Sequence, residues 1–489
     1  MNYLSASWFV QQAISADLDN AGTPALAVGS DESVYFAIPT KSTADPLWYT
    51  MTVGKLAPTG ALQWSYAFPE LVTSTDNIQP ALVVGQDGEL FLAFMTTGSV
   101  VDRLNMAYVP NFCSNCSTVS YKDIVLARIE QPTTPTSPAT LTWYLQDATM
   151  NSCADETAPQ LAIDTKNRLL YITWQSTKNI QCYPSIGSNN ILLACFGYDG
   201  IQKWLEAMGN INAPTPHTNE NPVVAASQQG RVTVAWETRG AVVGGATPTG
   251  KQIEVVAFQT DVGNPTSYSK LWVGSSIFNV FAVGGDSYSP TIVSTNEGNL
   301  YLAFITEGTV NGGTHTASVQ DLVTVGLNTN GTLRWMRQGP VYNNGAAAYT
   351  SASNPYMTVD IWGNPYLSLQ ADASKILLFR FDYRNGNTQW SYTEPPNTYN
   401  AYGYALTDAP FRVFPTSAGS YSKTTVAIYN TSLYLATTVA SPLTAPGQTR
   451  SSPGNDLVIT SLKQQLYTSL TPYQYITNNK IICGCSCVC

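Results

Sequence analysis

Short stretches of alternating apolar and polar residues recur along the chain, and a tight turn interrupts each of them. Residues 80–94 read as apolar strand, glycine turn and apolar strand, and residues 290–304 repeat that order. Further copies begin at Pro24, Pro159, Pro222, Pro355 and Lys423. Period-two alternation bounded by turn residues is typical of β-hairpins. The pattern therefore predicts a chain built from seven related hairpins.

A second hairpin follows each of these units, and its last strand is centred on a tryptophan. The first strand of that hairpin is apolar, as in residues 123–128 and 321–326. In four copies a glycine precedes the tryptophan by four residues: Gly60–Trp64, Gly200–Trp204, Gly331–Trp335 and Gly386–Trp390. Trp143 and Trp272 hold the same place without the glycine. Because glycine supplies the positive φ of a tight hairpin turn, each unit is expected to hold four strands.

Seven four-stranded units without helical periodicity predict an all-β fold: a single seven-bladed β-propeller of antiparallel blades over residues 1–465. Trp8 matches the tryptophan strand but precedes every complete unit. We therefore expect an N-terminal strand to close the ring by completing the last blade, although Tyr467 or Leu470 could fill that position instead. Residues 466–489 then form a cysteine-rich tail outside the ring, which we expect to act as a tether.

One stretch resembles a known repeat family. Residues 321–335 carry the pattern Asp-x-Val-x-x-x-Leu-x-x-x-Gly-x-Leu-x-Trp, which is similar to the bacterial-type β-propeller repeat called SBBP. The Gly-x-x-x-Trp element is also similar to the tryptophan-docking motif of PQQ-like propellers. The resemblance covers about 10–460 and implies a propeller without a particular activity. The chain has no vicinal cysteine pair, so quinone-binding residues are not carried over.

The connections between strands differ in length between the two rims of such a ring. Turns within the first hairpins are short, whereas the connections that follow them, and those that join successive units, are long. The long connections are 95–122, 145–158, 175–189, 237–251, 275–289, 305–320, 338–354, 393–422 and 437–455. Long loops on a rigid scaffold are the usual place for binding, so we expect ligand binding at this rim.

Acidic residues recur four positions before the proline of the first strand. They are Asp76, Asp155 and Asp286. Because the first strand lines the channel, these carboxylates could surround its mouth and bind Ca²⁺ or a cationic ligand, or hydrolyse a glycoside. The favoured interpretation is that they cap turns by accepting backbone N–H groups. Loop aromatics are further ligand-binding candidates: Trp48, Tyr108, Tyr183, Tyr342, Tyr399 and Tyr402.

Cysteines gather in two places. Cys113, Cys116, Cys153 and Cys182 lie in long loops, where disulfides are favoured over a zinc site or free thiols. In the tail, Cys483, Cys485, Cys487 and Cys489 alternate, and an extended strand would present them on one face. Inter-subunit disulfides, soft-metal binding and lipidation are the alternatives for this row.

Charge excludes some partners. The net charge is −9, only 11% of residues are charged, and there are two histidines. No basic run is present to bind nucleic acid, and no apolar stretch is long enough to span a membrane. No signal peptide is visible at the N-terminus, and we expect no cofactor.

These features favour a non-catalytic structural or interaction propeller within a larger assembly such as a virion or an extracellular surface layer. Its expected partners are other proteins or further copies of the chain, bound through the long-loop rim and the tail. Two alternatives stay open. One is a lectin-like propeller that binds glycans, and the other is a glycoside hydrolase or lyase that uses carboxylates at the channel mouth.

Overall fold

The computed structural model describes most of the strands and the shorter connections of the chain. The described residues are 2–12, 24–41, 49–71, 77–97, 121–132, 137–146, 149–152, 154–177, 189–207, 209–212, 218–242, 244–277, 282–310, 313, 315, 320–338, 352–371, 375–394, 425–429, 432–439 and 456–466. The cysteines of the long loops and of the tail fall outside them, as do Asp76 and all six loop aromatics named above.

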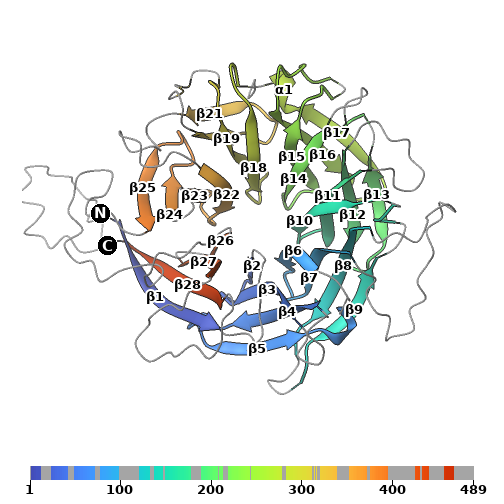
Figure 1. The fold of residues 1–489 in the computed structure, drawn as a ribbon, viewed down its shortest axis with the longest axis vertical. Helices are drawn as coiled ribbons and strands as arrows, with labels where there is room; N and C mark the ends of the chain where they lie inside the picture. The colour runs from blue at the N-terminus through green and yellow to red at the C-terminus, as the bar shows by residue number, and fades with distance from the viewer. Residues whose placement is uncertain are drawn as a thin grey trace, which may run out of the picture.

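Seven four-stranded antiparallel sheets form a ring around a central channel (Figure 1), which confirms the predicted seven-bladed propeller. Blade 1 consists of β2 (Ala25–Val28), β3 (Val34–Lys41), β4 (Tyr49–Leu56) and β5 (Leu62–Ala67). Blade 2 consists of β6 (Asn77–Val84), β7 (Leu90–Thr96), β8 (Asp123–Glu130) and β9 (Thr140–Leu145). Blade 3 consists of β10 (Glu156–Asp164), β11 (Leu169–Ser176), β12 (Asn190–Gly197) and β13 (Gln202–Glu206). In each blade the first strand lies at the channel and the last at the outside.

Blades 4 to 6 repeat this order. Blade 4 consists of β14 (Asn219–Ala226), β15 (Arg231–Thr238), β16 (Gln252–Thr260) and β17 (Tyr268–Val273). Blade 5 consists of β18 (Ser287–Ser294), β19 (Leu300–Thr306), β20 (Asp321–Leu327) and β21 (Leu333–Gln338). Blade 6 consists of β22 (Ala352–Val359), β23 (Pro365–Ala371), β24 (Lys375–Phe381) and β25 (Thr388–Glu394). Two short helical turns, η1 (Pro69–Leu71) and α1 (Gly274–Ile277), follow the outer strands of blades 1 and 4.

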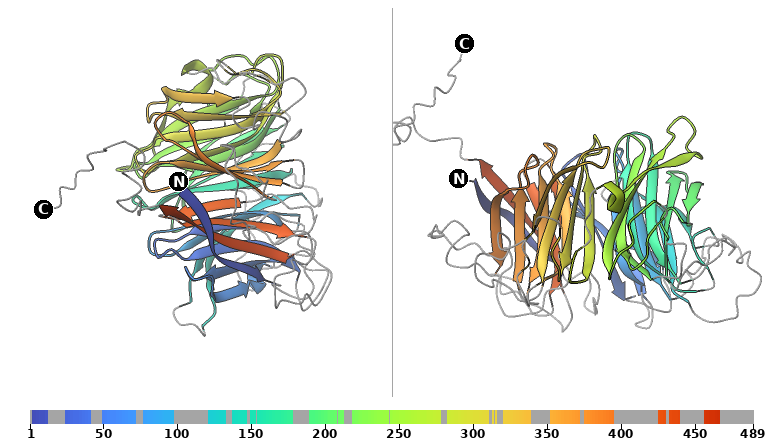
Figure 2. Two further views of the ribbon diagram at one scale, coloured as in Figure 1. Left: turned by 90° about the vertical axis from the view of Figure 1, so that its left-hand side faces the viewer. Right: turned by 90° about the horizontal axis from the view of Figure 1, so that it is seen from above.

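Blade 7 joins the two ends of the described chain. Its strands are β26 (Thr425–Tyr429), β27 (Ser432–Val439), β28 (Asp456–Leu466) and, as the outer strand, β1 (Asn2–Gln12). In the ladder Trp8 lies opposite Ser461, just as Trp335 lies opposite Gly326 in blade 5, and a register shift follows at the same place in both. The N-terminal strand therefore closes the ring in the register that the tryptophan repeat predicts (Figure 2).

Tryptophans of the outer strands pack against the next blade. Trp143, Trp272 and Trp335 cover glycines in the following blade's last turn, where a Cβ would lie 3.1, 2.7 and 2.4 Å from the indole rings. These turn glycines, Gly200, Gly331 and Gly386, have φ between 70° and 82°. Trp204, Trp272 and Trp335 are buried, whereas Trp64 and Trp143 are only half-buried. Apolar clusters between neighbouring blades form the core.

Candidate functional site

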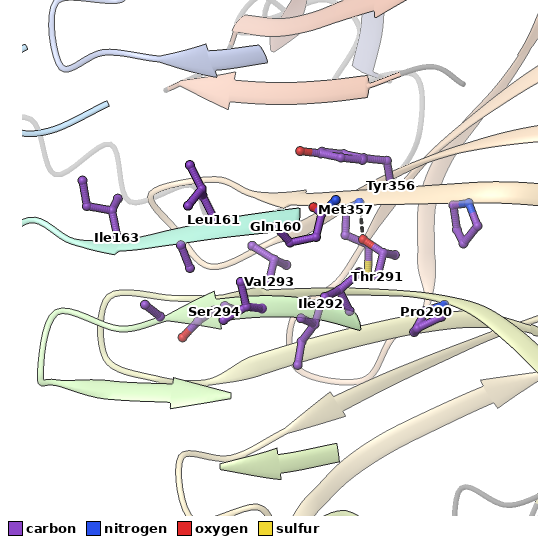
Figure 3. A pocket seen from close by; sticks show the side chains of 16 residues that line it. Gln160, Leu161, Ile163, Pro290, Thr291, Ile292, Val293, Ser294, Tyr356 and Met357 are labelled. Atoms are coloured by element: carbon purple, nitrogen blue, oxygen red, sulfur yellow. Dashed lines mark hydrogen bonds between the residues drawn. The ribbon is translucent and has the colours of Figure 1, made fainter. Parts of the chain in front are cut away.

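The central channel itself offers little chemistry. The inner strands of blades 3 to 6 enclose a cavity of about 210 Å³, lined mainly by apolar side chains (Figure 3). Leu161, Ile163, Val293 and Met357 are among them, and Thr291 accepts a hydrogen bond from the Met357 amide at 3.1 Å. No charged side chain lines this cavity. Reactive groups must therefore be sought at the channel mouth, on the rim of the blade-to-blade connections.

Each inner strand of blades 2 to 5 is strained near that mouth. The residue before the strand's proline has a φ of 52–55°, which is rare for a residue other than glycine: Gln79, Ala158, Asn221 and Ser289. The ladder shifts register at these positions, so each is a β-bulge. Strained backbone of this kind is frequent at binding sites, where the surrounding contacts hold it in place.

A side chain of the preceding blade holds the amide of three of these bulges. Gln79 Oε1 accepts a hydrogen bond from Ala158 N at 3.1 Å, and Gln175 Oε1 accepts one from Asn221 N at 3.4 Å. Between blades 4 and 5 the acceptor is a carboxylate, because Glu237 Oε1 takes the Ser289 amide at 2.8 Å. At blade 4, therefore, the acceptor of the bulge amide is a carboxylate, whereas it is a neutral glutamine amide at blades 2 and 3.

Glu237 occupies a ladder position that is apolar or neutral in neighbouring blades. Met95, Gln175 and Ile305 stand at the equivalent positions of blades 2, 3 and 5. Glu237 is 2% exposed, and its second oxygen pairs with Lys251 Nζ at 2.9 Å. Lys251 also binds Glu220 at 2.8 Å. Burial opposes the charge of Lys251, but its hydrogen bonds to the two glutamates outweigh that effect and raise the pKa of Lys251.

A second ion pair lies beside the first. Arg239 binds Asp286 at 3.0 Å, and both side chains are substantially exposed. The other oxygen of Asp286 accepts the Lys251 amide at 2.9 Å. Asp155 accepts the Lys122 amide at 3.1 Å in the same position of blade 3, so both aspartates cap a loop end. Of the three predicted mouth aspartates, the structure describes these two.

A tyrosine and a glutamate complete the cluster on blade 5. The Tyr288 hydroxyl donates a hydrogen bond to Glu307 Oε1 at 3.2 Å, and Gln320 Nε2 approaches the same oxygen at 3.5 Å. Burial, with the nearby charge of Glu307, raises the pKa of Tyr288, so the phenol keeps its proton and acts as the donor. The Glu307 amide donates to the Asp286 carbonyl at 2.9 Å, which joins the two halves of the cluster.

We call this cluster the blade 4–5 mouth. It consists of Glu220, Glu237, Arg239, Lys251, Asp286, Tyr288 and Glu307. Only Asp286 was among the candidates from sequence. The signal that could have found the others is the repeat itself. Residues 236–240 read Trp-Glu-Thr-Arg-Gly, where the equivalent residues 94–98 read Phe-Met-Thr-Thr-Gly.

A different acidic group lies inside blade 3. Glu156 is fully buried, and its Oε1 accepts hydrogen bonds from the Ser152 amide and hydroxyl and from the Ser176 hydroxyl. Among the described residues nothing pairs with its Oε2. Burial raises the pKa of Glu156 to about 8, and burial likewise raises that of nearby Asp123 to about 6. Glu156 is therefore a neutral acid in the folded protein at neutral pH.

We expect the free energy of unfolding to fall as the pH rises from about 4.5 towards about 8, because the folded protein holds the Glu156 proton that the unfolded chain releases. This contribution is complete below the unfolded pKa and is lost as the pH passes the folded one. Glu156→Gln, a neutral isostere, should remove this part of the pH dependence. Denaturant titrations of both proteins across that range measure it, and a parallel decline in the two would contradict the assignment.

No three histidine, cysteine or acidic side chains of the described residues are grouped to hold a metal ion. Among those residues no helix is long and apolar enough to cross a membrane.

Comparisons with known proteins find similarity in fold alone. No protein-family model matches the sequence, and a search of curated proteins finds no match. An ulvan lyase of polysaccharide lyase family PL25, solved with a -[GlcA(1-4)Rha3S]- ligand, is 10% identical with a TM-score of 0.49; the match covers 92% of this chain and 95% of that one. The polysaccharide lyase Uly1 is 9% identical with a TM-score of 0.48, over 91% and 90% of the chains. The GH93 α-L-arabinofuranosidase of Fusarium graminearum is 10% identical with a TM-score of 0.40, over 92% and 95%.

These comparisons correct the expectation from sequence. The prediction of a non-catalytic structural or interaction propeller, with no enzymatic activity, is wrong: the similar propellers named here are glycan-active enzymes. A virion or surface-layer assembly gains no support, and neither do the expected protein partners. The SBBP resemblance is matched at the level of the propeller fold alone.

Proposed function

We propose that this propeller is a glycoside hydrolase that cleaves a neutral glycan at the blade 4–5 mouth. The observation that carries the proposal is the hydrogen bond between the Tyr288 hydroxyl and Glu307, which lie at the rim with Glu307 exposed to solvent. A nucleophile within hydrogen-bonding distance of its base, with the base held by a third group, is the common arrangement of nucleophilic catalysis. Gln320 is that third group here.

The pair can act on an anomeric carbon. Tyr288 Oη attacks that carbon while its proton passes to Glu307 Oε1, and the glycosidic C–O bond breaks as its oxygen takes a proton from a water molecule. The hydroxide formed from that water then attacks the anomeric carbon and breaks the glycosyl–tyrosine bond, and Glu307 returns its proton to the phenolate. The raised pKa of Tyr288 fits this order, because the phenol stays protonated until a sugar is bound.

The remaining charges of the mouth favour a neutral sugar. Lys251 is held by two glutamates and Arg239 by Asp286, so both cations are already paired. In the part of the chain that the structure describes, Glu307 has no lysine or arginine partner, and the whole protein carries a net charge of −9. A uronate or sulfated sugar would have to break an existing ion pair. Elimination at a uronate also needs a cation to neutralise its carboxylate. Hydrolysis of a neutral chain needs neither.

Neutral sugars instead require hydrogen-bond acceptors and donors around their hydroxyl groups. Asp286 and Arg239 are half-exposed beside Glu307, and Glu220 is partly exposed, so all three can bind hydroxyls of a chain that lies across the mouth. The loop aromatics predicted from sequence remain candidates for stacking on such a chain. The SBBP resemblance also remains a prediction and adds no activity to this proposal.

A polysaccharide panel tests the proposal. The protein is incubated with neutral polymers (arabinan, galactan, xylan, mannan) and with anionic ones (ulvan, polygalacturonate, sialylated glycoprotein). We expect new reducing ends from at least one neutral polymer and no unsaturated, ultraviolet-absorbing product from the uronates. Unsaturated products would establish a lyase instead. Binding to a glycan array without cleavage of any polymer would favour the lectin-like alternative and overturn the hydrolase.

A further inference from the structure

Blade 4 contains a second buried glutamate that breaks the repeat. Glu254 in β16 lies opposite Trp236, and the equivalent positions of blades 2, 3 and 5 hold Val125, Leu192 and Val323. All three of those side chains belong to the apolar core, and Glu254 itself has no exposed surface. A carboxyl group in place of a core aliphatic residue loses its hydration and must recover hydrogen bonds within the protein. Its partners therefore indicate what it is for.

Apart from the Val255 amide of its own strand, these partners lie on α1, the short helical turn that follows the outer strand of blade 4. Glu254 Oε1 accepts the Ser275 amide at 3.0 Å, and Oε2 pairs with the Ser275 hydroxyl. Ser275 Oγ in turn accepts the Ala246 amide at 2.9 Å. The Ser275 hydroxyl donates to Oε2, and burial raises the pKa of Glu254 against the opposing effect of these hydrogen bonds. The chain of contacts runs from the core strand through α1 to the loop 239–251.

The loop passes close to this pair at Gly245, where an added Cβ would force a neighbouring side chain to move. A Cβ on Gly245 would lie 2.9 Å from Ser275 Oγ and 3.0 Å from Glu254 Oε2. The Ser276 hydroxyl also donates to the Gly244 carbonyl, which gives the loop a second attachment to α1. Nearby, Gln252 accepts the Ala282 amide at 2.7 Å and donates to the Gly285 carbonyl at 3.1 Å.

Both attached segments end at the blade 4–5 mouth. The loop 239–251 begins with Arg239 and ends with Lys251, and the connection that starts at α1 ends with Asp286. Their free ends meet in the ion pair of Arg239 with Asp286 and in the hydrogen bond from the Lys251 amide to Asp286. The contact between Glu254 and Ser275 thus joins the two segments whose ends carry these side chains.

We infer that Glu254 is a positioning residue, a buried latch that holds the loop 239–251 against α1 and so places Arg239, Lys251 and Asp286 for the glycan. The latch stands on its own contacts, whereas its effect on turnover rests on the proposed hydrolase function. Glu254 contacts no reacting atom in this scheme and affects the mouth only through its hydrogen bonds with Ser275.

Three variants test the latch by hydrogen exchange. Glu254→Val supplies the aliphatic residue of the other blades and should fold. The Ser275 amide then loses its acceptor, and the Ala246 amide donates to a Ser275 hydroxyl that Glu254 no longer holds. Both amides should therefore exchange at least about tenfold faster. Glu254→Gln keeps an acceptor for the Ser275 amide and a polar group beside the Ser275 hydroxyl, so it should retain the wild-type protection. Leu192→Val, at the equivalent position of blade 3, is the matched control and should leave both amides protected. Should Glu254→Val not fold, Ser275→Ala removes the same link and should release Ala246 alone.

Unchanged protection of Ala246 in Glu254→Val or Ser275→Ala would overturn the latch. Faster exchange throughout blade 4 would also overturn it, because Glu254 would then be an ordinary core residue. The exchange result needs no substrate, so it decides the latch even if the panel finds no hydrolysis. On a cleaved polymer, Glu254→Val should raise KM more than it lowers kcat, and Glu254→Gln should restore the wild-type KM. If the exchange results are as expected but KM does not follow this pattern, Glu254 still holds the loop against α1 but has no effect on catalysis.

Discussion

Glu307→Gln and Tyr288→Phe are each expected to lower kcat on a cleaved neutral glycan by about 100-fold or more, while KM changes little. Proton transfer by a positioned side chain contributes roughly 10²–10⁴-fold to a rate. Glutamine keeps the hydrogen bond from Tyr288 but cannot take its proton, and phenylalanine removes the nucleophile altogether. Release of reducing ends at saturating and limiting substrate separates the two kinetic constants.

The double variant gives a sharper result. If the phenol and the carboxylate act as one unit, Tyr288→Phe with Glu307→Gln should be hardly slower than either single variant. Thr177→Ala is the matched control, because Thr177 follows β11 as Glu307 follows β19 and donates its amide to the Asp155 carbonyl in the same way. Full activity in both single variants, or equal losses in the Thr177 control, would remove the pair from the mechanism.

The propeller could be predicted because its information is local and repeated. Each hairpin carries its own alternation and turn residues, and each outer-strand tryptophan marks a ladder position. Trp8 could therefore be assigned to blade 7 from sequence, although its partner Ser461 lies at the other end of the chain. How deeply each of these tryptophans is buried could not be predicted from the repeat. Trp143 is half-buried although it covers Gly200, because its exposure depends on the neighbouring blade and its loops.

The candidate site was harder to predict because neighbouring blades share it. Glu237 in β15 accepts the amide of the Ser289 bulge in β18. The two residues are about fifty positions apart, so no local sequence pattern predicts this contact. The spacing of Asp155 and Asp286 was visible in the sequence, and the structure places both as loop caps. The spacing could not reveal that Asp286, unlike Asp155, also pairs with an arginine among the described residues. The cysteines of the long loops and of the tail lie outside the described residues, as do the loop aromatics, so their roles stay predictions.

The error about function has a physical origin. A low overall content of charged residues was taken to indicate a surface without catalytic groups. Charge can be scarce in total and still concentrated, and here six charged side chains meet at one junction of two blades. Local departures from the repeat, such as Glu237 and Glu254 at positions that are uncharged in the neighbouring blades, are a better guide to chemistry than the composition of the whole chain.

Deletion of residues 1–12 should cost a large part of the roughly 5–15 kcal/mol that stabilises a typical domain. β1 pairs with β28 from Asn2 to Gln12, and without it blade 7 loses its outer strand and exposes the edge of β28. An unpaired strand edge also favours aggregation. Thermal melting and light scattering should show a strongly lowered Tm and association.

Truncation after Leu466 is the matched control for that deletion. It leaves every described strand in place, so we expect the melting transition to be retained, while any association that depends on the predicted tail is lost. The two results together test the division of the chain into a ring over 1–465 and a separate tail. If instead the N-terminal deletion melts like the full chain, β1 contributes no closure and a C-terminal segment such as that around Tyr467 or Leu470 must complete blade 7. If the C-terminal truncation fails to fold, the tail belongs to the propeller core, because only a segment that buries apolar surface in the ring could be indispensable to it.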